Sequence, residues 1–179
     1  MIVLLFAATL AAEPAVTLGA EPGAGLPTGA LVLPSAAFTL PIVEGEAVTR
    51  GGADRGLVTV KSAAVDQNLS WEPVVGDMEA TARHELGLVR RASAQSGTST
   101  ATEGTLTETE VAGRRALTWQ ARVDNTLFLG TTFDCPDARV VLVSFGSTNA
   151  HVRRAHGRSL AGAVCAASAA AAPTPWGPS

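Results

Sequence analysis

The chain has 179 residues, and its 13 Lys and Arg against 16 Asp and Glu give a formal net charge of −3. This balance argues against a nucleic-acid-binding protein, whose surface is usually basic. The length suits one domain with tails, and because only 4% of the residues are aromatic and Tyr is missing, the core must be aliphatic.

The first twelve residues, MIVLLFAATLAA, are apolar and precede Glu13 and Pro14. Such a run is too short to span a bilayer as a helix, but it suits the hydrophobic region of a secretory signal, although no Lys or Arg occurs before Arg50. We expect residues 1–12 to be a signal peptide. The protein would then be exported, periplasmic or secreted, without stable insertion in a membrane.

Two segments have the composition of tails. Residues 13–28 are rich in Ala, Gly and Pro without a helical or strand period, so they cannot bury a face that offsets their ordering entropy. Residues 167–179 contain three prolines, which forbid a continued helix. We expect a flexible linker and a disordered tail on either side of one domain, residues 29–166.

The domain begins with strand-like runs. Gly29–Leu33 and Ala37–Val43 are short and apolar, and nearby or internal prolines confine them to edge strands or strand starts. The glycine-containing segment Glu44–Arg55 has loop composition. Gly56–Ala64 alternates apolar and polar residues, which predicts a strand.

A helix is predicted over Val74–Ala94. Met78, Ala82, Leu86 and Val89 recur at helical spacing, so one apolar stripe should face a sheet. The charged residues between them should form the solvated face; they are Glu79, Arg83, Glu85 and Arg90.

Four further strands follow: Thr105–Val111, Arg115–Val123, Thr126–Asp134 and Arg139–Phe145. Only short turns connect them, which forces antiparallel pairing of neighbours and predicts a meander. The last run is apolar almost throughout, as expected of a central strand covered on both faces.

The final helix is predicted over Ala150–Ala166, with Asn149 as its N-cap. Its sheet-facing side should carry Val152, Ala155, Ser159 and Ala163. The residues Arg153, Arg154, His156 and Arg158 could form a basic binding patch, but they are more typical of the solvated face of one helix.

The chain has two cysteines, Cys135 at the end of a strand and Cys165 near the end of the last helix. In an exported chain this pair favours a disulfide. The alternative is a reactive cysteine with His151 or His156 as base. It is disfavoured because neither cysteine sits at a helix N-terminus or glycine-rich turn that would lower its pKa.

No other catalytic, cofactor-binding or metal-binding set is predicted, and no cofactor is expected. His84, His151 and His156 lack metal-ligand spacing. Glu108 and Glu110 share one face of a strand like a glycosidase carboxylate pair, but a TETE strand is typical of a solvated edge. Nucleophile-elbow, phosphate-loop and dinucleotide motifs are missing.

The order of these elements, with the segments Phe38–Ile42, Gly113–Trp119 and Arg139–Phe145, resembles the PsbP-like family and its exported bacterial relatives of the DcrB and LpqN kind. The resemblance implies an α+β fold in which two helices flank an antiparallel sheet, and accessory or assembly roles rather than catalysis. We therefore expect a non-catalytic exported module that binds a protein or another component of the cell envelope. An inhibitor or immunity protein, or a small hydrolase with an unrecognised site, are the alternatives.

Overall fold

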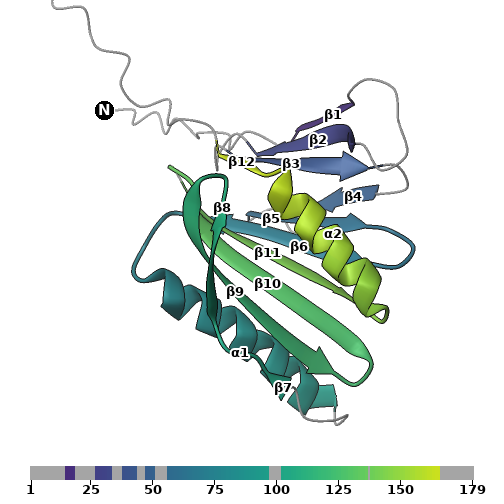
Figure 1. The fold of residues 1–179 in the computed structure, drawn as a ribbon, viewed down its shortest axis with the longest axis vertical. Helices are drawn as coiled ribbons and strands as arrows, with labels where there is room; N and C mark the ends of the chain where they lie inside the picture. Colours follow the sequence, from purple (N-terminus) through teal and green to yellow (C-terminus); the bar gives the residue numbers. More distant parts are fainter. Residues whose placement is uncertain are drawn as a thin grey trace, which may run out of the picture.

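The computed structural model describes residues 15–18, 27–33, 38–43, 47–50, 56–96, 102–136 and 138–165. These residues form two antiparallel sheets and two helices, so the expected α+β fold is confirmed (Figure 1). The predicted signal peptide, residues 1–12, and the predicted tail, residues 167–179, lie outside the described residues.

The larger sheet has the strand order β4-β5-β6-β11-β10-β9-β7, and β8 also pairs with β9. Its strands are β4 Ala47–Arg50, β5 Gly56–Lys61, β6 Asp66–Glu72, β7 Thr102–Glu103, β8 Thr107–Val111, β9 Arg114–Val123, β10 Thr126–Asp134 and β11 Arg139–Gly146. The predicted meander is confirmed as β8 to β11. Two of its tight turns contain residues with positive φ, which are Ala112, Gly113 and Asp124.

Two predictions near the start of this sheet were wrong, and one strand was not predicted. The expected loop Glu44–Arg55 contains β4, which extends the sheet because Val48 lies opposite Val60 of β5. The strand expected to reach Ala64 ends at Lys61, since Ser62 turns the chain by bonding to the Val65 carbonyl. We also did not predict β6, whose polar residues mask the alternation of its buried side chains.

The smaller sheet has the order β1-β2-β3-β12, with β1 Ala15–Leu18, β2 Pro27–Leu33, β3 Phe38–Val43 and β12 Val164–Cys165. Segment 13–28, which we predicted to be a linker, contains β1. This strand, Ala15–Leu18, pairs with β2. On its other side, β3 pairs with β12 only at Phe38 and Thr39. Pro41 therefore lies where β12 no longer pairs, as its missing N–H requires.

Helix α1 spans Met78–Ser96, four residues later than predicted at its start. The chain turns at Gly76, which has a φ of +67°, and an Asp77 side-chain oxygen then accepts the Glu79 backbone N–H at 3.2 Å. This hydrogen bond is the capping interaction that opens many helices.

Helix α2 spans Asn149–Ala161, so Asn149 is its first residue rather than its cap, and Thr148 occupies the N-cap position. The predicted end at Ala166 was wrong. The helix stops at Gly162, where a Cβ would come within 2.6 Å of the Pro41 side chain. The chain then enters β12, and Cys165 lies on a strand rather than on the helix.

The helices cover opposite faces of the larger sheet (Figure 1). On one face, Met78, Ala82 and Leu86 of α1 pack against side chains of β9. On the other face, Val152 and Ala155 of α2 pack against Leu127 of β10. Strand β11 occupies the predicted central position, but α1 packs mainly on β9 and β10, so Val143 and Phe145 on the α1 side are only half-buried.

Candidate functional site

A groove of about 470 Å³ lies between α1 and the sheet, and we call it the α1 groove. Its wall on α1 consists of Glu85, Leu88, Val89 and Ala92 with two serines. The sheet contributes Val123, Phe128, Val143 and Phe145, and β6 contributes Asn68 and Ser70. The groove exists because the apolar run of β11 extends beyond the area that α1 covers.

Two aromatic rings lie side by side on the sheet side of the α1 groove. Phe128 and Phe145 are register partners on β10 and β11, and their ring centroids are 5.4 Å apart with planes inclined by 16°. Opposite them, Leu88 on α1 is 42% exposed although it is a large apolar side chain. The lining is therefore mainly hydrophobic and accessible.

Glu85 is the one ionisable residue among those that line the α1 groove. We expected it on the solvated face of the helix, but it is half-buried because the helix faces the sheet on this side as well. The pKa of its carboxyl group is raised, mainly because of burial. The nearby His84 partly offsets this rise, and Glu72 adds to it. Among the described residues, no Lys or Arg forms a salt bridge with Glu85.

A buried polar network lies on the opposite face of the sheet, under α2. The two ring nitrogens of His156 are each 2.8 Å from a hydroxyl, Nε2 from Thr131 and Nδ1 from Ser144. The Gln67 side-chain amide then donates to the hydroxyls of Ser144 and Ser159, both at 3.0 Å. The expected solvated position of His156 was wrong, because α2 turns His156 inward together with Ser159, three residues later.

This network has a structural role. Ser144 and Ser159 have no exposed surface, and both ring nitrogens of His156 already have partners. Burial lowers the pKa of His156 to about 4, which keeps the ring neutral at ordinary pH.

Glu85 and His156, whose pKa values are shifted by burial, lie on opposite faces of the sheet. Phe128 packs with the α1 cluster, whereas Thr131, three residues along the same strand, contacts His156 on α2. Residues three apart on a strand point to opposite faces. Glu85 and His156 therefore cannot act on one substrate atom together.

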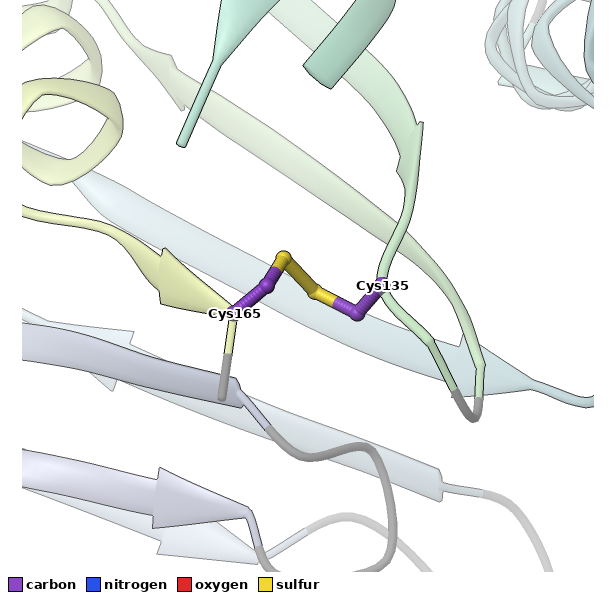
Figure 2. Close-up of a disulfide and its surroundings, with 2 residues drawn as sticks. All are labelled: Cys135 and Cys165. Atoms are coloured by element: carbon purple, nitrogen blue, oxygen red, sulfur yellow. A yellow bond between two sulfur atoms is a disulfide. The ribbon is translucent and has the colours of Figure 1, made fainter. Parts of the chain in front are cut away.

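The structure joins Cys135 and Cys165 in a disulfide, with their Cα atoms 5.3 Å apart (Figure 2). Cys135 follows β10 of the larger sheet, and Cys165 ends β12 of the smaller sheet. The bond thus links the two sheets. With both sulfurs in this bond, neither is a thiolate for the alternative reactive-cysteine site.

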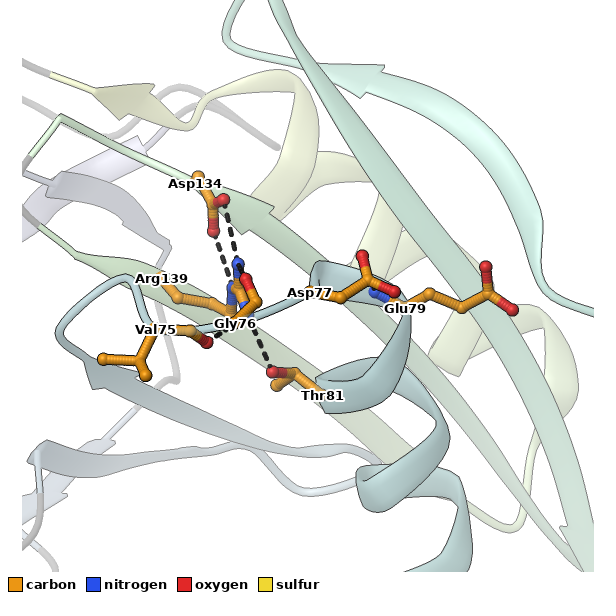
Figure 3. A network of polar contacts seen from close by, with 7 residues as sticks. All are labelled: Val75, Gly76, Asp77, Glu79, Thr81, Asp134 and Arg139. Carbon is orange, nitrogen blue, oxygen red and sulfur yellow. Dashed lines mark hydrogen bonds and ion pairs between the residues drawn. The ribbon is translucent and has the colours of Figure 1, made fainter.

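Arg139 is a buried charged residue that the sequence analysis did not single out. It is the first residue of β11, its side chain is 2% exposed, and its guanidinium makes two bonds to Asp134, at 2.8 and 3.1 Å (Figure 3). It also donates to the backbone oxygens of Val75 and Gly76 and to the hydroxyl of Thr81. Arg139 therefore fixes the start of α1 to the hairpin between β10 and β11.

The remaining candidate residues do not converge. His84 and His151 are exposed on different helices. Glu108 forms a salt bridge with Arg115 at 3.0 Å, and Glu110 is exposed on the same strand. In the part of the chain that the structure describes, no three His, Cys, Asp or Glu residues come together as metal ligands.

The basic patch on α2, which we weighed as an alternative to a solvated helix face, does not include all four residues. Arg153 and Arg154 are exposed, Arg158 is half-buried and His156 is buried. Arg153 donates to the Gln120 side-chain oxygen at 3.2 Å, beside a polar hollow of about 600 Å³. His156 is therefore not part of a basic surface, and only the arginines of α2 remain accessible.

Comparison with known proteins identifies the fold. No family model and no curated protein sequence matches the chain. The solution structure of cyanobacterial PsbP (CyanoP) from Synechocystis sp. PCC 6803 has a TM-score of 0.61 at 12% identity, and the match covers 83% of this chain and 98% of that one. The fold is therefore PsbP-like, as the element order indicated, whereas the narrower resemblance to the DcrB and LpqN kind is not confirmed.

Neither helix of the described residues has the length and apolar character that a membrane crossing requires.

Proposed function

We propose that the protein is a non-catalytic accessory module, exported to the cell envelope, and that it binds a partner or envelope component through the α1 groove. The observation that carries this proposal is the incomplete cover of β11. Val143, Phe145 and Phe128 form an apolar surface that α1 borders without closing. An accessible apolar surface of this kind commonly marks a binding site.

The arrangement of ionisable groups supports a binding role over catalysis. General acid and base groups must reach the same reacting atoms. In this fold Glu85 faces the α1 groove, while His156 is held by two hydroxyls under α2.

Export is supported by two features of different kinds. Disulfides persist mainly in oxidising compartments outside the cytoplasm, and the structure contains one between Cys135 and Cys165. The apolar residues 1–12 also have the composition of a signal sequence.

Site-specific crosslinking tests the proposed function. A photoreactive amino acid placed at Leu88, in the wall of the α1 groove, should crosslink a defined component of the cell envelope. The same group at Glu110, exposed on β8 away from the groove, should not. Crosslinking at Glu110 alone would place the contact elsewhere. Turnover of ester, peptide or glycoside substrates that one substitution abolishes would show an enzyme instead.

A further inference from the structure

We propose that the α1 groove binds a small organic cation, in which an apolar aliphatic or aromatic body carries one ammonium group. The body would lie against Phe128 and Phe145, and the nitrogen would lie at the Glu85 carboxylate. This inference rests on the proposed function, because it takes the α1 groove as the binding surface and names the chemistry of its ligand.

The dimensions and lining of the α1 groove suit a small molecule. Its volume of about 470 Å³ lies within the roughly 300–1,000 Å³ of typical ligand pockets. Such pockets are mostly hydrophobic, with a few polar groups that orient the ligand. Leu88, Val89 and Ala92 on one side and Val143 and the two phenylalanines on the other provide the hydrophobic part.

The charge of the ligand follows from Glu85. This residue is the one ionisable group of the lining, and no described Lys or Arg neutralises it through a salt bridge. Burial makes its ionised form unfavourable, as the raised pKa indicates. A ligand cation would offset that cost, whereas a ligand carboxylate would be repelled.

The aromatic rings favour the same sign of charge. The face of a phenylalanine ring carries partial negative charge and attracts an ammonium group placed over it. Phe128 and Phe145 lie stacked in the lining of the groove that contains Glu85. The rings therefore disfavour an anionic ligand, as Glu85 does, and the ammonium group is assigned to the Glu85 carboxylate.

Three probes of equal chain length separate the contributions of charge and apolar contact. We would measure the binding of octylammonium, octanol and octanoate to the full-length oxidised protein by calorimetry, at neutral pH and below micelle-forming concentrations. Octylammonium should bind about tenfold more tightly than octanol, because one partly shielded ion pair contributes roughly 1.4 kcal/mol. Octanoate should bind most weakly.

Matched variants assign the effect to the groove. Glu85→Gln should lower the affinity for octylammonium about tenfold and leave the affinity for octanol unchanged. Glu110→Gln removes the same charge from an exposed position on β8 and should change neither. Ala92→Trp should abolish the binding of all three probes, because Ala92 is exposed at the groove wall and the larger side chain would occupy the α1 groove without disturbing the core.

Several outcomes would overturn the inference. Equal affinities for octylammonium and octanoate, an unchanged affinity in Glu85→Gln, or binding that survives in Ala92→Trp would each contradict it. The absence of binding by all three probes would also contradict it. In that case a partner crosslinked at Leu88 would leave the proposed binding function intact, so the two failures are distinguishable.

Discussion

Arg139 shows how one side chain can tie distant segments together. Its guanidinium is buried at the start of β11, yet it has acceptors on the β10 strand end, on the segment before α1 and on α1 itself. The planar group can donate in several directions at once, which a lysine cannot reproduce. The buried charge is tolerated because all three nitrogens of the guanidinium donate hydrogen bonds to acceptors.

Replacing Arg139 should therefore be costly. We expect Arg139→Met to lower the free energy of unfolding by about 1–3 kcal/mol, because Asp134, the Thr81 hydroxyl and two backbone carbonyls lose their donor, while Asp134 is 30% exposed and keeps part of its hydration. Urea denaturation checks this value. The control is Arg115→Met, which removes an exposed salt bridge to Glu108 and should change the free energy of unfolding far less, because water screens this pair. Similar losses in the two variants would show that the Arg139 cluster contributes no more than a surface pair.

His156 should make stability depend on pH. Its pKa is about 4 in the folded protein and about 6.5 in the unfolded chain, so the unfolded chain binds more protons between these values. Stability from this group is complete above about pH 6.5 and should fall with acidification by up to about 1.4 kcal/mol per pH unit, until about pH 4.

Unfolding free energies of the wild type and His156→Gln between pH 7 and pH 4 test this dependence. The variant should lose part of the slope, whereas His151→Gln, at an exposed position of α2, should retain it. An unchanged slope in His156→Gln would mean that other groups cause the acid sensitivity.

Residue-level features were the hardest to predict from the sequence. Glu85 and His156 have the same local setting as any charged or polar residue on an amphipathic helix. Their burial depends on how far each helix is rotated and where it lies across the sheet. The sequence did contain a signal for the α1 groove. This signal is the apolar run of β11, which is longer than the part of the strand that α1 covers. It also placed Asp134 and Arg139 on either side of the turn that brings them together.

Among the elements, the pair β9 and β10 depends on a close contact at Gly130. Gly130 lies opposite Trp119, and a Cβ at this position would be 2.0 Å from the indole ring. The ring therefore lies directly over the glycine. Only a residue without a side chain permits this packing under α1.

Gly130→Ala should therefore destabilise the protein by about 1–3 kcal/mol, the usual cost of overpacking a core. Gly157→Ala is the matched control, because a Cβ there meets nothing within 4 Å and Gly157 is exposed within α2. Alanine favours the helix over glycine by about 1 kcal/mol, so this variant should be more stable than the wild type. Thermal unfolding followed by circular dichroism measures both. A neutral Gly130→Ala would show that the indole ring can move aside.

The elements themselves were predicted with uneven success, for physical reasons. The meander was predictable because apolar alternation, short turns and local pairing agree with one another. β6 was not, because one of its faces is polar and its partners, β5 and β11, provide much of its stability. The end of α2 was not predictable in the same way, because Gly162 lies close to Pro41, a residue far away in the sequence.

For the whole molecule, the disulfide is the covalent link between the two sheets, and it should stabilise the fold by constraining the unfolded chain. Its cysteines are 30 positions apart, and closing a loop of that length stabilises a protein by about 3–4 kcal/mol in the chain-entropy estimate. The double variant Cys135→Ser and Cys165→Ser should lose about this much free energy of unfolding and keep the wild-type circular dichroism spectrum. Thiol titration of the denatured, non-reduced wild type should detect no free thiol. Two titratable thiols would contradict the bond.

The topology of the larger sheet also sets an order of folding. The hairpins from β8 to β11 pair neighbouring segments. In contrast, β6 pairs with β11, which lies far away in the sequence; Leu69, for example, is the partner of Leu142. Contacts between distant segments form slowly, since the chain entropy of closing the loop must be overcome first. Asn68 and Ser70 on β6 and Val143 and Phe145 on β11 line the α1 groove. During folding, the α1 groove is therefore completed only when this long-range pairing forms, and a chain that ends before β11 leaves β6 with an open edge toward other molecules.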